Sequence, residues 1–352
     1  MSSGLVREAE DGHTASGRPP ILLEINPRRG YLVGIDIGAT HISTLITDFS
    51  GNVIYEVENP FDINIAPEVG LQQIDHCLQS TLKDLQLDLQ AVIGIGVGVP
   101  GPIVAREGIV SSPPLMPGWD LYPIRARLEE KWSRPISLGN DAELGALGEW
   151  AHGAGRGEQN LAYIKVGTGV GAGFLLNGKI YRGATGSAGE IGHITIREDG
   201  PQCTCGNFGC LEALAGGNAI ARQAQQAVRS GRRTQLAAID PVESITAHDV
   251  ASSARRGDHV AQQIIMEAGT YLGIAIASLV NLFNPSMVVV GGGVAQIGDL
   301  LLQPMRQVVQ QRSLPSVARV VRISTAVLGR RSTSMGAVVQ AHNLVLDQLT
   351  QD

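Results

Sequence analysis

From Tyr31 onward, apolar residues recur along the chain as short strand-length runs and as helical stripes. The runs are rich in Val, Ile and Thr and are bounded by Gly, Asn, Asp and Ser, which is typical of β-strands. Between them, Leu and Ile recur every three or four residues, as on the buried face of a helix. In the first half this pattern predicts strands at 31–36, 41–47 and 52–58, a helix at 67–85, a strand at 91–97, a helix at 123–132 and a strand at 136–138.

The order three strands, helix, strand, helix, strand is predicted again in the second half, although no sequence period marks it. We therefore expect a duplicated α/β architecture with mixed sheets and a cleft between the halves, where ligands bind at the carboxyl ends of strands. The second half has predicted strands at 161–166, 171–176, 179–181, 191–196, 287–290 and 320–324, and helices at 143–150, 217–229, 248–256, 259–283, 300–312 and 334–349.

Residues 1–30 do not share this pattern. Two short apolar runs, Leu5-Val6 and Ile21-Leu-Leu23, flank a polar, turn-rich segment from Glu8 to Pro20. This arrangement is typical of a β-hairpin with a long mobile tip, and equally of a disordered tail.

Composition narrows the class of protein. The chain has 352 residues, which is long enough for two domains. Its residues are 43% hydrophobic and 17% charged, which is typical of a globular protein. The net charge of −6 argues against a broad nucleic-acid-binding face. Four cysteines and the lack of an apolar signal-peptide stretch indicate a cytoplasmic protein. The apolar stretch at 271–283 is too short and too broken to cross a membrane.

The densest group of ligand-type side chains lies at 189–212. Zn²⁺ prefers four tetrahedral N and S ligands, and Cys₃His is a complete set. The alternative, a disulfide and a spare thiol, is weaker because nothing else in the chain suggests disulfides. Two carboxylates, Glu190 and Glu212, flank the group and are not needed by a filled zinc site. The candidate ligands are His193, Cys203, Cys205 and Cys210.

Three glycine turns follow strand-like runs and could contact a nucleotide. A glycine hairpin can offer backbone N–H groups to phosphate, and a nearby aspartate can lie close to a phosphate-bound Mg²⁺. Any one turn could be an ordinary hairpin or cap, but three together favour a nucleotide, with the third suited to adenosine. The candidate contacts are Asp36, Gly38 and Thr40, then Gly167, Thr168 and Gly169, then Gly291, Gly292 and Gly293.

Asn140-Asp141 follows a short strand and opens the second half. An aspartate there can be a helix N-cap. It can equally be a general base that takes a proton from a substrate hydroxyl, with Asn140 fixing the substrate.

Together these motifs resemble the ROK family, which groups bacterial repressors, open reading frames and sugar kinases. The resemblance covers residue 31 to the C-terminus, and its last two motifs are highly specific. The motifs are Asp36-Ile-Gly-Ala-Thr40, Val99-Pro-Gly-Pro102, Asn140-Asp141, Gly167-Thr-Gly-Val-Gly171, Glu190-Ile-Gly-His193 and Cys203-Thr-Cys-Gly-Asn-Phe-Gly-Cys-Leu-Glu212.

The resemblance implies an actin-like, hexokinase-like (ribonuclease H-like) fold of two lobes, at 31–138 and 139–330, with the final helix at 331–352 packing back on the first. It implies structural zinc, Mg²⁺ with ATP, a hexose or N-acetylhexosamine as ligand, and a homodimer or homotetramer. Asp141 would be the catalytic base. The sugar hydroxyls would be bound by Asn140, Asp141, Glu190, His193 and Glu212.

This chain departs from ROK kinases at two places. Ala39 stands where a second glycine is usual, and its methyl group would crowd the backbone only if φ were positive. Residues 4–8 and 15–26 look like the wing hairpin and linker of a ROK repressor, whose helix-turn-helix should precede them and is absent from this sequence.

Two functions are therefore compared. The favoured one is an ATP-dependent hexose kinase of glucokinase type, which transfers the γ-phosphate to the sugar 6-hydroxyl. The other is the effector-binding part of a sugar-sensing transcriptional regulator, favoured by the wing-like segment, Ala39 and His41. DNA binding by this chain alone is not expected, because Arg7 and Arg18 offer too few phosphate contacts.

Overall fold

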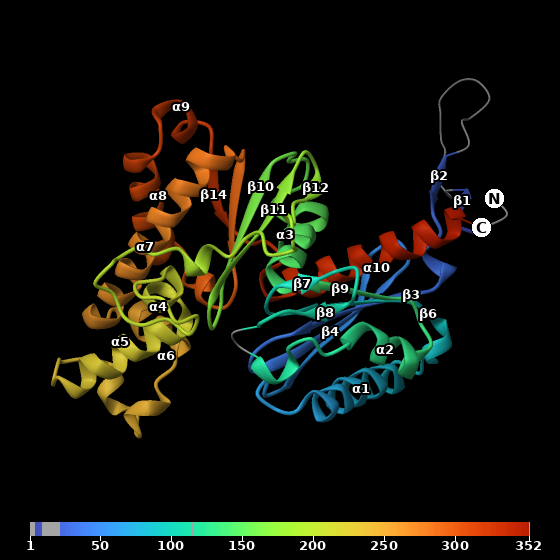
Figure 1. Ribbon diagram of the computed structural model, residues 1–352, viewed down its shortest axis with the longest axis horizontal. Helices are drawn as coiled ribbons and strands as arrows, with labels where there is room; N and C mark the ends of the chain where they lie inside the picture. Colours follow the sequence, from blue (N-terminus) through green and yellow to red (C-terminus); the bar gives the residue numbers. More distant parts are fainter. Residues whose placement is uncertain (1–3, 9–21, 114–115, 352) are drawn as a thin grey trace. The chain divides into compact units, whose positions relative to one another are not determined.

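The computed structural model describes residues 4–8, 22–113 and 116–351 (Figure 1). The chain divides into two compact units. The first unit is Met1–Asp141 with Ser334–Asp352, and the second unit is Ala142–Thr333. Each unit is built on one five-stranded sheet.

The sheet of the first unit has the order β5-β4-β3-β6-β9. β3, β4 and β5 pair antiparallel, whereas β6 and β9 extend the sheet in parallel. This is the predicted mixed sheet, with strand ends within a few residues of the prediction. The strands are β3 Tyr31–Ile37, β4 His41–Asp48, β5 Val53–Pro60, β6 Val92–Val99 and β9 Ile136–Asn140.

Helices cover both faces of this sheet (Figure 1). α1 Pro67–Asp84 and α2 Ile124–Trp132 bury Leu and Ile side chains in one core with the strands. On the other face, α10 Ser332–Gln351 lies against the backbone of β3 and β6. Gly34 and Gly96 make this close approach possible, because a Cβ at either would overlap a carbonyl of α10.

The sheet of the second unit repeats the same order, β12-β11-β10-β13-β14. β10 pairs antiparallel with β11 and parallel with β13, which pairs parallel with β14. The predicted duplication is confirmed by this identical arrangement of strands. The strands are β10 Leu161–Val166, β11 Val170–Leu176, β12 Lys179–Ile180, β13 Met287–Gly291 and β14 Arg322–Thr325.

The helices of the second unit form its main core with the sheet. By length and composition, α7 is the one helix of the described chain that could cross a membrane, but 61% of its apolar window is buried inside the protein. It is the central core helix of this unit. The helices are α3 Asp141–His152, α4 Leu211–Ala215, α5 Gly217–Arg229, α6 Ala247–Arg255, α7 His259–Phe283, α8 Asp299–Arg312 and α9 Pro315–Ala318.

The predicted strand at 191–196 is wrong. The segment Ile191–His193 is a turn of 3₁₀ helix, and only Thr195 makes an isolated bridge, to Cys210. Gly189 (φ 101°) turns the chain sharply where a Cβ would overlap the Ala172 carbonyl. A short apolar run does not by itself distinguish strand from helix, and here packing against β11 decided.

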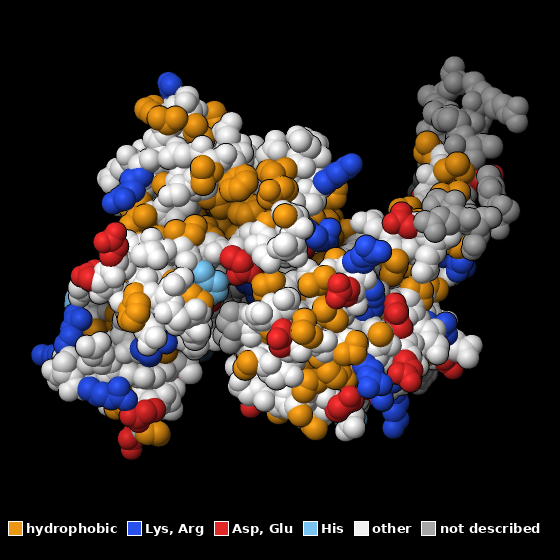
Figure 2. Space-filling view, viewed as in Figure 1, with side chains coloured by type: hydrophobic (Ala, Val, Ile, Leu, Met, Phe, Trp, Pro, Cys, Tyr) orange, Lys and Arg blue, Asp and Glu red, His pale blue; other side chains and the backbone are white. Residues whose placement is uncertain are grey.

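The described part of the N-terminus forms the hairpin that was one of two alternatives. β1 Val6–Glu8 pairs antiparallel with β2 Leu23–Ile25. Its apolar side chains are exposed (Figure 2), with Leu23 at 56% and Ile25 at 45%. The predicted mobile tip lies outside the described residues. A second small hairpin, β7 Ile103–Val104 with β8 Ile109–Val110, was not predicted.

Candidate functional site

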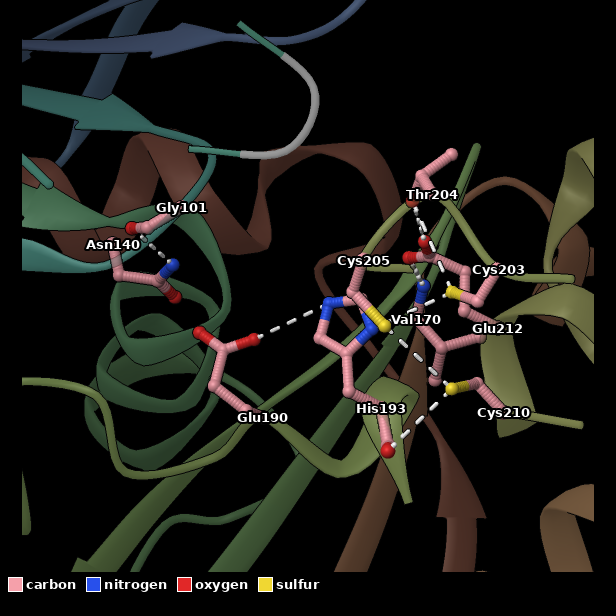
Figure 3. Close-up of polar contacts among 10 residues, drawn as sticks. All are labelled: Gly101, Asn140, Val170, Glu190, His193, Cys203, Thr204, Cys205, Cys210 and Glu212. Carbon is pink, nitrogen blue, oxygen red and sulfur yellow. Dashed lines mark hydrogen bonds and ion pairs between the residues drawn. The ribbon is translucent and has the colours of Figure 1, made fainter. Parts of the chain in front are cut away.

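Four metal-ligand side chains come together in the second unit (Figure 3). The ligand atoms of His193, Cys203, Cys205 and Cys210 all lie within 4.8 Å of one another. The Sγ atoms of Cys205 and Cys210 are 3.7 Å apart, and Cys203 Sγ is 3.6 Å from His193 Nδ1. Tetrahedral zinc with Zn–S bonds of about 2.3 Å has S–S edges of about 3.8 Å. The four residues therefore fit Zn²⁺ in ligand type and in spacing.

The disulfide alternative is wrong. All four cysteines of the chain are free, and a disulfide requires an S–S distance of about 2.05 Å. The loop reverses at Gly206 (φ 93°) and Gly209 (φ 65°), the glycines of the C-x-C-x₄-C segment. At Gly209 a Cβ would overlap the Arg197 carbonyl. The turn that brings the Cys210 thiol to the other two thiols therefore requires glycine at this position.

The thiols need a cation to ionise together. Burial, followed by the neighbouring Cys205 and Cys203 thiols, raises the pKa of Cys210 to about 12. A zinc ion reverses this preference because a coordinating thiol is deprotonated outright. When bound, the ion would serve as a structural crosslink of this loop.

His193 uses its two ring nitrogens in different directions. Nδ1 points toward Cys203 Sγ, and Nε2 lies 3.8 Å from the Glu190 carboxylate (Figure 3). Both residues belong to the same 3₁₀ turn, where a spacing of three places side chains on one side. Metal on Nδ1 would leave the proton on Nε2, so the ring would present an N–H donor beside a carboxylate acceptor.

Glu212 lies on the other side of the ligand cluster, in the first turn of α4. Its Oε2 accepts a hydrogen bond from the Val170 backbone N–H (3.1 Å), and its Oε1 accepts one from the Thr204 hydroxyl (3.3 Å). A carboxylate has about four acceptor positions. It therefore retains capacity for a ligand hydroxyl while making both contacts.

The second glycine turn, Gly167–Gly171, is held from within the same unit. The Gly167 N–H donates to the Gly169 carbonyl (3.0 Å). The carbonyls of Gly167 and Thr168 accept from the first residues of α5, Gly217 (2.8 Å) and Asn218 (3.1 Å). The turn is thus joined to the segment that starts at the candidate zinc ligand Cys210.

The first glycine turn is partly covered by a side chain. A Cβ at Gly38 would lie 2.8 Å from the His41 imidazole ring, whose Nδ1 is 3.5 Å from the Thr40 hydroxyl. Asp36 is buried, at 3% exposure. Ala39 does not adopt positive φ, so its methyl group is tolerated without backbone strain. The His41 ring, rather than the Ala39 methyl group, therefore limits the space at this turn.

Packing accounts for two glycines of the third turn. A Cβ at Gly291 would overlap the Tyr163 ring, and Gly292 (φ 88°) lies against the backbone of Val166. Gly293 has no neighbouring atom within 4 Å of a Cβ position. Of the three glycines, Gly293 is therefore the one beside which the structure leaves open space.

The two residues predicted to fix and deprotonate a substrate lie at the junction of a strand and a helix. Asn140 ends β9, and Asp141 is the first residue of α3. The Asn140 amide donates to the Gly101 carbonyl (3.0 Å) in Val99-Pro-Gly-Pro102, where Gly101 has φ 99°. That motif thus orients the Asn140 side chain.

Two sheets of identical strand order define an actin-like, duplicated α/β protein, and the Cys₃His loop is its distinctive feature. The sequence profile of the ROK family matches residues 32–343. The chain therefore belongs to the ROK family, and the resemblance noted from the motifs is confirmed.

Its relatives include two kinds of protein. The chain is 38% identical to a glucokinase of Halalkalibacterium halodurans over 308 residues, 87% of this chain and 93% of that protein. It is 33% identical to the xylose repressor of Caldicellulosiruptor bescii over 338 residues, 96% of this chain and 84% of the repressor.

Solved structures give the same division. A ROK family transcriptional regulator, a homolog of the E. coli MLC protein, has a TM-score of 0.84 at 26% identity and covers 100% of this chain and 89% of that chain. A ROK glucokinase from Streptomyces griseus in complex with glucose and AMPPNP has a TM-score of 0.80 at 30% identity. It covers 89% of this chain and 100% of that chain. The function is therefore that of a sugar kinase or a sugar-sensing regulator.

Several residues of the site were not found from the sequence. Thr204 and Val170 bind Glu212, and the His41 ring covers Gly38. Thr204 had a usable signal, because it is a hydroxyl residue between two predicted ligands. Val170 had no such signal in the sequence, since it binds Glu212 through its backbone N–H and not through its side chain.

Proposed function

We propose that this protein is a sugar-responsive ROK regulator whose zinc-ordered loop binds a monosaccharide, a hexose or N-acetylhexosamine. One observation carries the choice over a kinase. The β1–β2 hairpin lies before residue 32, where the family match begins. The regulator structure covers 100% of this chain, whereas the glucokinase structure, itself covered completely, matches 89%.

The sugar would be held by groups that pair donors with acceptors. Glu190 and Glu212 offer carboxylate oxygens, and His193 offers an Nε2–H beside Glu190. Vicinal hydroxyls of a monosaccharide both donate and accept, so they complement such a set. By motif position we assign Asn140 and Asp141 to the same sugar. We also propose a cytoplasmic homo-oligomer, which light scattering would measure.

The second candidate is an ATP-dependent hexose kinase, and the conformation of Ala39 favours it. Since φ is not positive there, the first phosphate turn keeps an unstrained backbone. In this case Asp141 would take the proton of the sugar 6-hydroxyl as general base. Mg²⁺–ATP would lie on the glycine turns, and positioning would supply most of the catalysis.

One pair of measurements separates the candidates. Calorimetry with glucose, xylose and N-acetylglucosamine measures sugar binding by the zinc-loaded chain. An ADP-release assay with the same sugars measures phosphorylation, with Asp141→Asn as the control. A regulator binds one sugar and releases no ADP above the control. Sugar-dependent ADP release that Asp141→Asn abolishes would establish the kinase, and no binding by any sugar would overturn both.

The gene supplies an independent test. An in-frame helix-turn-helix encoded together with this chain would support the regulator. Kinase activity together with an unrelated upstream sequence would contradict the regulator.

A further inference from the structure

Glu212 connects the metal-ligand loop to the Gly167–Gly171 turn. On the loop side, its Oε1 accepts from the hydroxyl of Thr204, which lies between the ligands Cys203 and Cys205 (Figure 3). On the turn side, its Oε2 accepts from the Val170 N–H at 3.1 Å. One carboxylate thus bridges the metal-ligand loop and a turn whose contacting residue, Val170, is 42 residues before Glu212 in the chain.

The backbone around this carboxylate is shaped to receive it. A Cβ at Gly169 would overlap Glu212 Oε2. A Cβ at Gly192 would overlap the Val170 carbonyl and approach Glu212 Cβ at 3.5 Å. Glycines at both positions therefore leave room for the Glu212 side chain and for the link to Val170.

The position of Glu212 is itself fixed by the start of α4. Glu212 is two residues after Cys210, which is buried and is the N-cap of α4. The α4 helix leads directly into α5, whose first N–H groups bind the carbonyls of Gly167 and Thr168. A metal bound to Cys210 would fix the start of α4, which carries Glu212. The same metal bound to Cys203 and Cys205 would fix Thr204, which donates to the Glu212 carboxylate.

We propose that Glu212 is a positioning residue that transmits the metal-bound order of the Cys₃His loop to the Gly167–Gly171 turn. Glu212 contacts the loop through the Thr204 hydroxyl and the turn through the Val170 backbone amide. The link goes beyond sugar binding, and it operates whether or not a sugar is phosphorylated. It also means that the Val170 N–H is engaged by a carboxylate, so a phosphate at this turn would use other donors.

Hydrogen exchange of the Val170 amide tests the link in the full chain, with zinc bound and after chelation with dipicolinate. In the wild type we expect zinc removal to speed exchange at Val170 by about tenfold, as a hydrogen bond to a charged group is lost. In zinc-loaded Glu212→Ala, exchange should already be fast, and chelation should change it less than about twofold. Glu198→Ala, at an exposed glutamate of the same region, is the matched control.

Thr204→Val is the second variant, because it keeps the carboxylate and all four ligands. Metal analysis should find zinc retained, while the response of Val170 to chelation falls to less than about threefold. A Val170 response equal to that of the wild type in either variant would overturn the proposal. So would a zinc-loaded Glu212→Ala protein with wild-type protection at Val170. If Glu212→Ala does not fold, Thr204→Val alone decides.

Discussion

Single side chains near the metal-ligand loop each serve two neighbours. His193 faces Cys203 with one nitrogen and Glu190 with the other, and Glu212 accepts from Thr204 and Val170. Glu212 makes the local geometry depend on a long-range contact, because it ties the loop at Thr204 to the start of β11 at Val170. Substituting either side chain therefore disturbs two contacts at once.

Glu143 gives a prediction at this scale. It is buried at 3% exposure in α3 and pairs with Arg182 (3.1 Å), which precedes the loop leading to Glu190. Burial raises the pKa of Glu143 from 4.5 to about 7, although Arg182 opposes the shift. The folded state therefore holds this proton in a pH range where the unfolded chain has released it.

The sign follows from proton binding. Between pH 4.5 and about 7 the folded state binds more protons, so the free energy of unfolding falls as pH rises and levels off above 7. In Glu143→Gln this slope should disappear. The free energy of unfolding of the variant, relative to that of the wild type, should therefore rise by about 3 kcal/mol between pH 4.5 and 7. Urea unfolding at pH 5, 6, 7 and 8 measures it. Glu198→Gln, which is exposed, should show a flat difference, and an equally flat Glu143→Gln would refute the assignment.

At the scale of elements, glycines decide how closely helices approach the sheets. β3 and β6 bury large residues on one face and present Gly34 and Gly96 to α10 on the other. The C-terminal helix therefore lies directly on strand backbone. Few side chains separate the two, so the contact tolerates little added volume.

We predict that Gly96→Ala destabilises the first unit by about 1–3 kcal/mol, because the new methyl group would overlap the Ala337 carbonyl of α10. Chemical denaturation measures the change. Gly118→Ala, where no atom lies within 4 Å of the added Cβ, should stay close to wild type. Equal stability of the two variants would mean that α10 is not seated on β6.

The Cys₃His loop is the second element with a clear test. Metal analysis should find about one Zn²⁺ per chain, and structural zinc stabilises its loop by roughly 10 kcal/mol. Cys205→Ser removes one ligand and should lose the metal, lower the melting temperature and weaken sugar binding. Cys77→Ser, in α1 of the first unit, should keep the metal. Unchanged melting and sugar affinity in Cys205→Ser would contradict a structural zinc.

For the molecule as a whole, the N-terminal hairpin is attached to the first unit and is not part of its core. Val6, Leu23 and Ile25 are exposed, and the family match begins only at residue 32. The strand β3 starts at Tyr31, after a short 3₁₀ turn at Pro27–Arg29.

A chain lacking residues 1–25 should therefore fold with the same melting temperature to within about 3 °C, since termini outside the core contribute little. Its sugar affinity should stay within about twofold of the full chain, because the proposed loop ligands are in the second unit. Differential scanning fluorimetry and calorimetry measure the two quantities. A large loss of stability would place the hairpin in the core.

The sequence by itself determined most of the elements, their duplicated order and the candidate metal-ligand set. These rest on local information, since periodicity follows backbone geometry and ligand spacing follows metal chemistry. The glycine turns and Asn140-Asp141 were also visible, because their residue types recur at strand ends. The hairpin of Val6–Glu8 with Leu23–Ile25 was only half determined, because two short apolar runs are compatible with several conformations.

Only the tertiary structure decided what these residues touch. It replaced the strand at 191–196 by a 3₁₀ turn, placed the His41 ring over Gly38 and joined Glu212 to Val170. It also gave Ala39 an unstrained φ. The 3₁₀ turn and the Glu212–Val170 contact depend on segments far apart in the chain, whereas the His41 and Ala39 results depend on local side-chain and backbone angles. Residue type alone encodes none of them. The physical reason is that packing against a neighbouring strand outweighs the small local preferences that a sequence pattern reports.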